Sequence, residues 1–277
     1  MAAEDEVGAD FKSDPRVSTL AYFGTELRIQ REQAGLSQSA LARRTFCTHS
    51  LVSRIESAQR IPSEEFAQRC DEALGTGGSF WRLWPVVIQH AYPDWFRPFV
   101  ELEKDATEIW GFENQVVPGL LQTEEYARAM FDAGSLPNAD ELVAARMTRQ
   151  SIFEKELPPE FWAVLDENVL RRVIGGPDVM KQQLERLVEA AEDPRITLQV
   201  LPLDIGAHAG LAGAFAGLAL KEGQDVLYVD GIVRGHVLAD PDDVKMGRRA
   251  YDLLRADALP PKASVKMIAA AAKEISP

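Results

Sequence analysis

Apolar and polar residues near the start of the chain alternate with the period of short amphipathic helices, in which every third or fourth residue faces a core. Four such helices are predicted, over residues 22–34, 38–45, 49–57 and 63–75. Ser37, Thr48 and Ser63 are suited to cap a helix N-terminus, and Gly35 and Gly75 are suited to end one. Helices this short and this closely spaced predict a compact bundle of roughly 55 residues.

The rest of the chain carries a different pattern. Helices are expected over residues 100–112, 123–131, 141–155, 178–191, 240–254 and 264–275. Short apolar runs, most of them separated by glycine-containing turns, predict strands over residues 161–165, 196–201, 215–220, 226–230 and 236–239. This order predicts an α+β domain with a small antiparallel sheet, so the fold class of the whole chain is mainly α and α+β overall.

These patterns divide the chain into four parts. Residues 1–20 are polar and acidic without a period, and we expect a disordered arm. A four- or five-helix domain is predicted over 21–76, followed by a Trp- and Pro-rich bridge over 77–99 that packs on the second domain. The C-terminal α+β domain is predicted over 100–277.

Charge changes this picture at one place. The 277-residue chain has a formal net charge of -13, which argues against general coating of nucleic acid or of an anionic membrane. From Gln33 to Ile55, however, there is no Asp or Glu, while Arg43, Arg44 and Arg54 lie in that stretch. Such a stretch either meets a polyanion or is a polar helix face that lacks acids by chance, and charge alone leaves both open.

Other features bound the class of protein. No apolar run reaches about 18 residues, and the first 20 residues lack the charged-then-apolar order of a signal peptide. We therefore expect a cytoplasmic protein without a membrane association. The two cysteines, Cys47 and Cys70, are too few for a disulfide framework, and a redox role for them stays open beside that of two inert thiols.

Three segments of the predicted bundle carry a resemblance. They are Gly35-Leu36-Ser37-Gln38-Ser39-Ala40-Leu41-Ala42-Arg43, Thr48-His49-Ser50-Leu51-Val52-Ser53-Arg54-Ile55-Glu56 and Arg60-Ile61-Pro62-Ser63. Residues 23–75 resemble the helix-turn-helix class typified by phage repressors and the xenobiotic-response-element regulators. In such a module the second helix of the motif lies in the major groove of DNA.

The resemblance implies a role for individual residues. Four would face base edges: His49, Ser50, Ser53 and Arg54. Five would contact phosphates: Gln38, Thr48, Arg43, Arg44 and Arg60. Arg31 and Glu56 would form an internal, structural ion pair. The implied partner is double-stranded DNA with a palindromic operator bound by a homodimer, and the alternative is a bundle of this type that serves protein contacts only.

The sequence departs from the family pattern at three positions. Phe46 and Ala58 stand where glycine is common, and Gln30 takes a usual leucine position. We therefore expect a longer or differently shaped turn at Phe46 and a slightly rotated first helix.

A second resemblance covers residues 95–275. It rests mainly on the segments 117–128, 146–150, 165–172 and 199–202. They resemble a domain of uncharacterised function that follows this helix-turn-helix in many actinobacterial regulators, the WhiJ-like group. The resemblance implies a nucleoid-associated transcription regulator, a repressor of developmental or secondary-metabolism genes, whose C-terminal domain binds a small partner protein that changes DNA occupancy.

Alternatives remain for the C-terminal domain. It would bind a small molecule and gate a repressor, or the chain would be an antitoxin-like neutraliser of a partner protein. An enzyme is not expected, and no cofactor or metal site is predicted, because His208 and His236 lack metal-ligand spacing on a helix. The arginines at 146, 149, 171 and 172 would line an anion site or pair with acids at 101, 103, 166 and 167, and ion pairs are the favoured interpretation.

Overall fold

The computed structural model describes residues 18–92, 95–134, 139–231 and 233–275, which form two compact units. The N-terminal unit takes the chain up to Pro93 together with Phe131–Thr148. The C-terminal unit takes Asp94–Met130 and Arg149–Pro277. Residues 1–17 of the arm predicted over 1–20 lie outside the described residues, and residues 18–20 belong to the cap and start of the first described helix.

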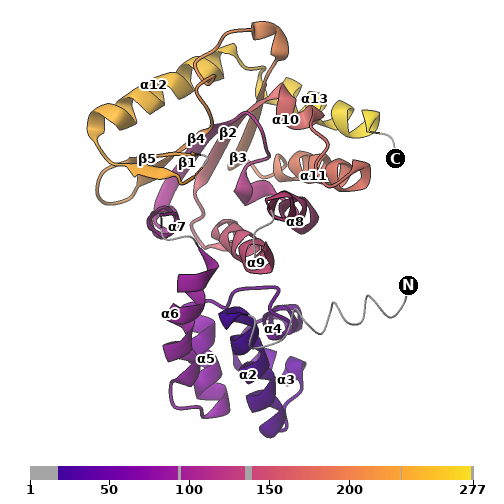
Figure 1. The fold of residues 1–277 in the computed structure, drawn as a ribbon, viewed down its shortest axis with the longest axis vertical. Coiled ribbons are helices and arrows are strands. Elements are labelled where there is room, and N and C mark those ends of the chain that lie inside the picture. The colour runs from indigo at the N-terminus through magenta and orange to yellow at the C-terminus, as the bar shows by residue number, and fades with distance from the viewer. Residues whose placement is uncertain (1–17, 93–94, 135–138, 232, 276–277) are drawn as a thin grey trace. The chain divides into compact units, whose positions relative to one another are not determined.

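From residue 18 to residue 92, the N-terminal unit contains five helices (Figure 1). They are α2 (Thr19–Gln33), α3 (Gln38–Arg44), α4 (His49–Glu56), α5 (Glu64–Leu74) and α6 (Ser79–Ala91). Ser18, Ser37, Thr48 and Ser63 each accept a hydrogen bond from the backbone N–H three residues ahead, as a helix N-cap does. The predicted second to fourth helices are therefore present at the expected caps.

Helices α2 to α5 all end in the same way. After each helix one residue takes a left-handed backbone conformation: Gly35, Phe46, Ala58 and Gly75 with φ of 66°, 54°, 57° and 68°. The N–H of the next residue then donates to a carbonyl five residues back, which closes the helix end. The expectation of a different turn at Phe46 is wrong, because Phe46 adopts the conformation that glycine favours.

The stretch 77–99, predicted as a bridge that packs on the second domain, contains α6, which packs on α2 and α5. The Phe80 ring lies 5.2 Å from the Phe23 ring, centroid to centroid. The indole Nε1–H of Trp84 donates to the Pro62 carbonyl at 2.8 Å. Phe80 and Trp84 therefore pack within the helical unit. At the end of the stretch, Trp95, Phe96 and Phe99 pack in the core of the C-terminal unit, so the bridge prediction holds for that end only.

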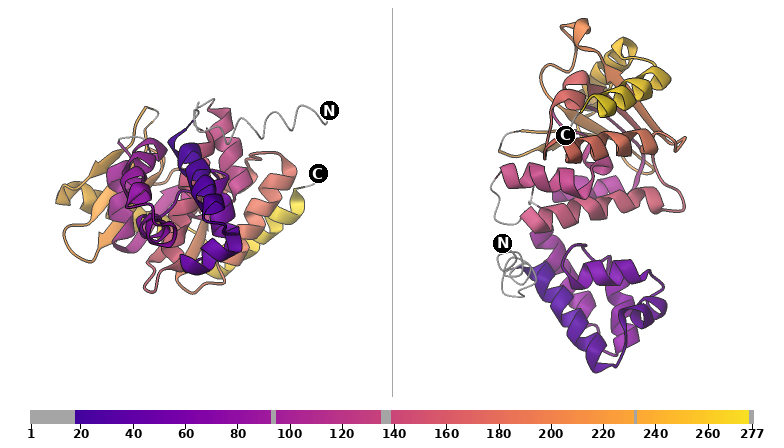
Figure 2. Two further views of the ribbon diagram at one scale, coloured as in Figure 1. Left: turned by 90° about the horizontal axis from the view of Figure 1, so that it is seen from below. Right: turned by 90° about the vertical axis from the view of Figure 1, so that its right-hand side faces the viewer.

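The C-terminal unit is built on a six-stranded sheet in the order β3-β2-β1-β4-β5-β6 (Figures 1 and 2). The strands are β1 (Ala106–Glu113), β2 (Glu160–Asp166), β3 (Ile196–Leu201), β4 (Phe215–Leu220), β5 (Val226–Val229) and β6 (His236–Leu238). β1, β2 and β3 run parallel to one another, and β4, β5 and β6 continue the sheet in antiparallel pairs.

Helices connect the strands and follow them. They are α7 (Arg97–Lys104), α8 (Glu124–Ala133), α9 (Ala139–Arg149), α10 (Glu167–Arg171), α11 (Pro177–Ala190), α12 (Pro241–Asp257) and α13 (Pro261–Glu274), with short 3-10 turns at Gly119–Leu121, Gln150–Glu154 and Leu203–Ile205. The parallel pairs need helical crossovers, which α8–α9 and α10–α11 provide.

Both faces of the sheet are covered, and successive side chains along each strand alternate between two cores. Ile109 belongs to the core under α11 and α13, whereas Trp110 and Phe112 belong to the core under α12. Figure 1 shows α12 on one side of the strands and α11 and α13 on the other.

Two expectations about the C-terminal unit are wrong in detail. Residues 100–112 are not one helix, because α7 ends at Lys104 and the central strand β1 follows. The sheet is mixed rather than antiparallel, although the fold class is confirmed as a helical region followed by an α+β domain. Within the described residues, no helix is long and apolar enough to cross a membrane.

Candidate nucleic-acid interface

The pair α3–α4 presents one buried and one exposed side. Val52, Ile55 and Glu56 face the core of the bundle, and all three are buried. His49, Ser50 and Arg54 are exposed, and Ser53 is half-buried beside them. Residues three and four apart share one helix face, so the four residues predicted to read bases lie together on the outer side of α4.

The structure joins Arg31 and Glu56 at the centre of the N-terminal unit. Arg31 Nε donates to Glu56 Oε1 at 2.5 Å, and a second guanidinium nitrogen donates to Oε2 at 2.9 Å. Gln38 Nε2 donates to the same Oε2 at 2.8 Å. The hydrogen bonds to Glu56 raise the pKa of Arg31 against the opposing effect of its burial. This cluster ties α2, α3 and α4 together and fixes the angle between the two helices of the motif.

The predicted phosphate contacts lie in different settings. The Thr48 hydroxyl accepts from the Leu51 N–H, so it caps α4. The Arg44 guanidinium donates to the Ala73 carbonyl at 3.3 Å, and Arg60 is half-buried between α4 and α5. Arg43 is exposed, and within the described part of the chain its side chain has no hydrogen-bond or ion-pair partner. Gln38 is oriented by Glu56.

Sequence reasoning missed three residues that hold the interface in place. A Cβ on Gly24 would lie 2.4 Å from the Ile55 carbonyl oxygen, so only glycine allows α2 to approach α4 this closely. Arg28 donates to the Glu56 carbonyl at 3.3 Å. Arg69 donates to the Thr45 carbonyl at 3.2 Å and thereby supports the α3–α4 turn. The available signal was Gly24 itself, because glycine in a helix interior is costly without a packing reason.

Comparison with known protein families covers both units. A model of a helix-turn-helix domain matches residues 23–79. A model of the domain of unknown function DUF5753 matches residues 96–270, well over half of the chain. The chain belongs to the DUF5753 family. No curated protein and no solved structure matches it. The helix-turn-helix domain in front of the DUF5753 domain makes the chain a DNA-binding regulator.

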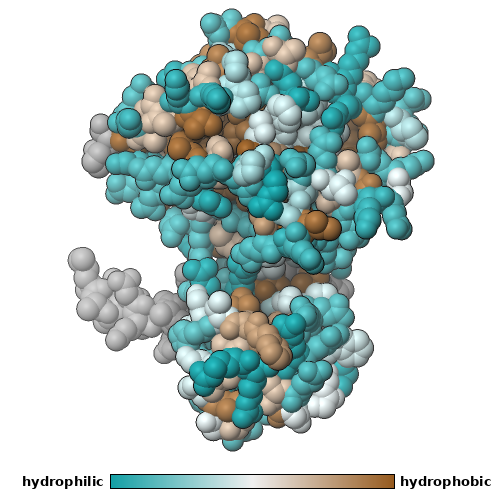
Figure 3. Space-filling model, turned by 180° about the vertical axis from the view of Figure 1, so that it is seen from behind, coloured by the Kyte–Doolittle hydropathy of each residue, from teal (hydrophilic) through white to brown (hydrophobic). Residues whose placement is uncertain are grey.

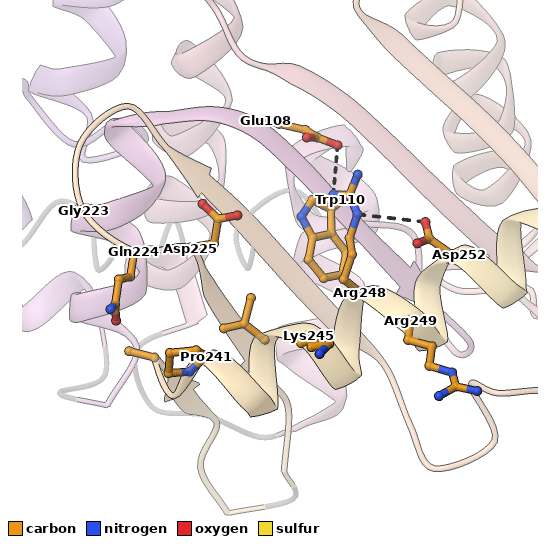
Figure 4. A pocket seen from close by; sticks show the side chains of 12 residues that line it. Glu108, Trp110, Gly223, Gln224, Asp225, Pro241, Lys245, Arg248, Arg249 and Asp252 are labelled. Atoms are coloured by element: carbon orange, nitrogen blue, oxygen red, sulfur yellow. Dashed lines mark hydrogen bonds and ion pairs between the residues drawn. The ribbon is translucent and has the colours of Figure 1, made fainter.

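The DUF5753 domain contains a pocket of about 820 Å³, largely open to solvent, between α12 and the sheet (Figure 4). Trp110 forms part of its lining, and the Arg248 guanidinium lies 5.0 Å from the centroid of that indole. Arg248 also pairs with Glu108 at 3.2 Å and, more loosely, with Asp252 at 4.0 Å. Lys245 completes a wall that combines both signs of charge. The volume of this pocket falls within the range of small-molecule sites.

Two of the DUF5753-domain arginines that could line an anion site form ion pairs instead: Arg149 in a buried pair, and Arg171, itself exposed, with a buried glutamate. Arg149 binds Glu103 with two hydrogen bonds, at 2.8 and 2.6 Å. Arg171 binds Glu167, whose other oxygen accepts from the Leu203 N–H at 3.0 Å. Burial opposes the shift, but the Leu203 and Arg171 contacts lower the pKa of Glu167 on balance. For these two arginines the ion-pair prediction is confirmed.

Proposed function

We propose that the protein is a sequence-specific transcription regulator that binds a palindromic operator as a homodimer. The carrying observation is the outer face of α4, where His49, Ser50, Ser53 and Arg54 lie together while Val52 and Ile55 anchor the helix. A homodimer is expected because one such module covers little DNA, and two-fold half-sites about 34 Å apart suit two copies of α4.

The direction and context of regulation rest on the resemblance to the actinobacterial WhiJ-like group of the xenobiotic-response-element class. On that ground we propose a repressor of developmental or secondary-metabolism genes, acting at the nucleoid in the cytoplasm and without catalytic activity. The DUF5753 domain would then receive the signal, through a small partner protein that changes DNA occupancy.

Genomic selection tests the DNA-binding proposal. Purified full-length protein is mixed with fragmented genomic DNA, and the enriched fragments are then bound in competition with scrambled DNA. We expect one enriched palindrome, and Arg54→Ala should lose the preference for it because a bidentate contact from arginine to guanine contributes about 1–3 kcal/mol of discrimination. The proposal fails if the wild-type protein enriches no sequence while remaining folded and dimeric.

A small-molecule ligand is the second candidate signal, and the cavity beside Trp110 supports it. The two signals predict different results. A protein partner forms a complex that co-purifies with the full-length chain. A ligand raises the unfolding temperature of the wild-type chain, and Lys245→Ala, on the cavity wall, removes the shift. A chain that neutralises a toxin differs from both, because its deletion would be lethal only when the partner is present.

A further inference from the structure

Phe46 combines two unfavourable features at one position. Its side chain is 81% exposed, and its backbone φ of 54° lies in the left-handed region, where an L-residue is strained. A glycine would close α3 with the same hydrogen bonds and without the strain. Neither the turn nor the core therefore requires a phenylalanine here, and strain of this kind gathers at functional positions.

The surroundings of Phe46 indicate what the ring meets. Phe46 lies two residues before Thr48, the cap of α4, so its Cα is within about 7 Å of the end of α4 that is predicted to enter the groove. The Arg69 guanidinium lies 5.4 Å from the centroid of the ring. Arg43 and Arg44 are exposed just before the turn, and the stretch from Gln33 to Ile55 holds no acid. The Phe46 ring is therefore an apolar group in a segment that carries arginines and no acid. Such a group complements a polyanion that also has apolar faces.

DNA has two such faces beside its phosphates. The 5-methyl group of thymine projects into the major groove, and the deoxyribose ring lines its wall. A self-associating surface fits less well, because the neighbouring arginines of a second copy would repel one another.

We propose that Phe46 is a DNA-contacting residue whose ring packs on the apolar face of a nucleotide, a thymine methyl or a deoxyribose, at the edge of the site read by α4. The proposal rests on the proposed function. Arg43 and Arg44, exposed in the residues just before the ring, would hold flanking phosphates, whereas Arg69 pairs with Glu65 and supports the turn. The ring adds an apolar contact that phosphate-binding residues lack.

The test compares variants that separate the ring from the turn. Phe46→Gly and Phe46→Asn both remove the ring, and both residues tolerate the left-handed conformation. Ala58→Gly is the matched control, since Ala58 has a φ of 57° at the opposite end of α4. Affinity for the selected operator and thermal unfolding are measured for each full-length variant.

We expect Phe46→Gly and Phe46→Asn to unfold no earlier than wild type and to bind the operator about tenfold more weakly. Phe46→Leu should fall between them and wild type, and Ala58→Gly should bind as wild type does. Wild-type affinity in both Phe46→Gly and Phe46→Asn overturns the proposal. So does a loss in Phe46→Gly alone, which would come from a more flexible turn, or a change in dimerisation without a change in DNA affinity.

Deoxyuridine placed at each thymine of the operator distinguishes the two nucleotide faces. If one such substitution weakens wild type but not Phe46→Asn, the ring meets that thymine methyl. If none does while Phe46→Asn still loses affinity, the ring meets deoxyribose. If the proposed function itself is wrong, wild type and Ala58→Gly also show no preference for any DNA, and both proposals fall together. If only the role of Phe46 is wrong, wild type still prefers the operator.

Discussion

At the scale of single residues, substitution of Arg43 tests the electrostatic contribution to DNA binding. Its guanidinium is exposed, and within the described residues no acid or carbonyl holds it. Arg43→Ala should weaken binding to operator and scrambled DNA alike, and it should reduce the slope of log K against log salt by about 1, because one phosphate contact is lost. Anisotropy titrations at three salt concentrations measure this. A loss confined to the operator would instead assign Arg43 to base reading.

The two cysteines differ in burial, and we expect them to differ in reactivity for that reason. Burial, the largest effect, raises the pKa of the Cys70 thiol, so Cys70 stays protonated over the pH range in which free cysteines become thiolates. Cys47, half-buried in the α3–α4 turn, lies at the surface of the same unit. In the folded protein at pH 7 to 9, a thiol reagent should therefore label Cys47 and spare Cys70 until the chain unfolds. Fast labelling of Cys70 in Cys47→Ser would contradict this.

At the scale of helices, Glu56 holds the motif together. Its side chain is fully buried against Arg31, which is itself 8% exposed. Glu56→Ala should destabilise the N-terminal unit by about 3–5 kcal/mol, because it removes the buried carboxylate that pairs with the buried arginine. Glu32→Ala is the control: Glu32 also pairs with Arg31, at 3.3 Å, but is 62% exposed, and its loss should cost less than about 1 kcal/mol.

Hydrogen exchange of the α4 backbone amides measures both effects in the full-length protein. Equal protection in Glu56→Ala and Glu32→Ala would show that the buried pair does not hold α4 in place. The two acids bind the same guanidinium, but Glu56 is buried and also accepts from Gln38, whereas Glu32 is exposed and makes a single contact with Arg31.

The sequence predicted most helices and strands because their residues repeat with a clear period. Strand β1 was not predicted because both of its faces are buried. Ile109 and Trp110 are adjacent and both apolar, and they belong to opposite cores. A strand covered on both sides loses the alternation by which strands are read. The parallel pairing was missed as well, because strand order depends on contacts between segments far apart in the sequence.

The same contrast holds for the interface. The outward face of α4 and the Arg31–Glu56 pair follow from a motif with fixed spacing, so the sequence could place them. The left-handed conformations of Phe46 and Ala58 could not be read, since a non-glycine residue gives no signal of a positive φ. The cavity near Trp110 was invisible for another reason: β1, the β4–β5 turn and α12 meet there only after the sheet has formed.

At the scale of the whole molecule, charge is distributed unevenly along the chain. The segment 21–75 has seven arginines and seven acids, whereas residues 76–277 have 21 basic and 31 acidic residues. Figure 3 shows one face of the chain covered mainly by hydrophilic residues, with apolar residues in small separate groups. We expect the acidic remainder of the chain to repel DNA, which would confine binding to the helical segment and lower non-specific affinity.

The N-terminal unit is not continuous in sequence, so the residue at which the DNA-binding module ends can be tested. The Tyr92 hydroxyl donates to the Ala145 carbonyl at 3.0 Å, and the Ile61 N–H donates to the Thr148 hydroxyl at 3.2 Å. A fragment of residues 1–93 lacks both acceptors. It should therefore unfold at a lower temperature than the same helices in the full chain.

Thr148→Val in the full-length protein is the matched control for that fragment. It removes the acceptor for the Ile61 N–H and the hydroxyl that donates to the Ala144 carbonyl at 2.7 Å, but it leaves the segment in place. It should therefore cost about 1–2 kcal/mol, much less than removal of the whole segment. Hydrogen exchange of α5 and α6 compares the fragment, this variant and wild type. If all three protect these helices equally, Phe131–Thr148 contributes nothing to the unit, and the DNA-binding module ends before residue 94. If the fragment alone loses protection, the DNA-binding module depends on a segment inserted between parts of the DUF5753 domain, and a signal that loosens that segment would reach α5 and α6 through the contacts of Tyr92 and Ile61.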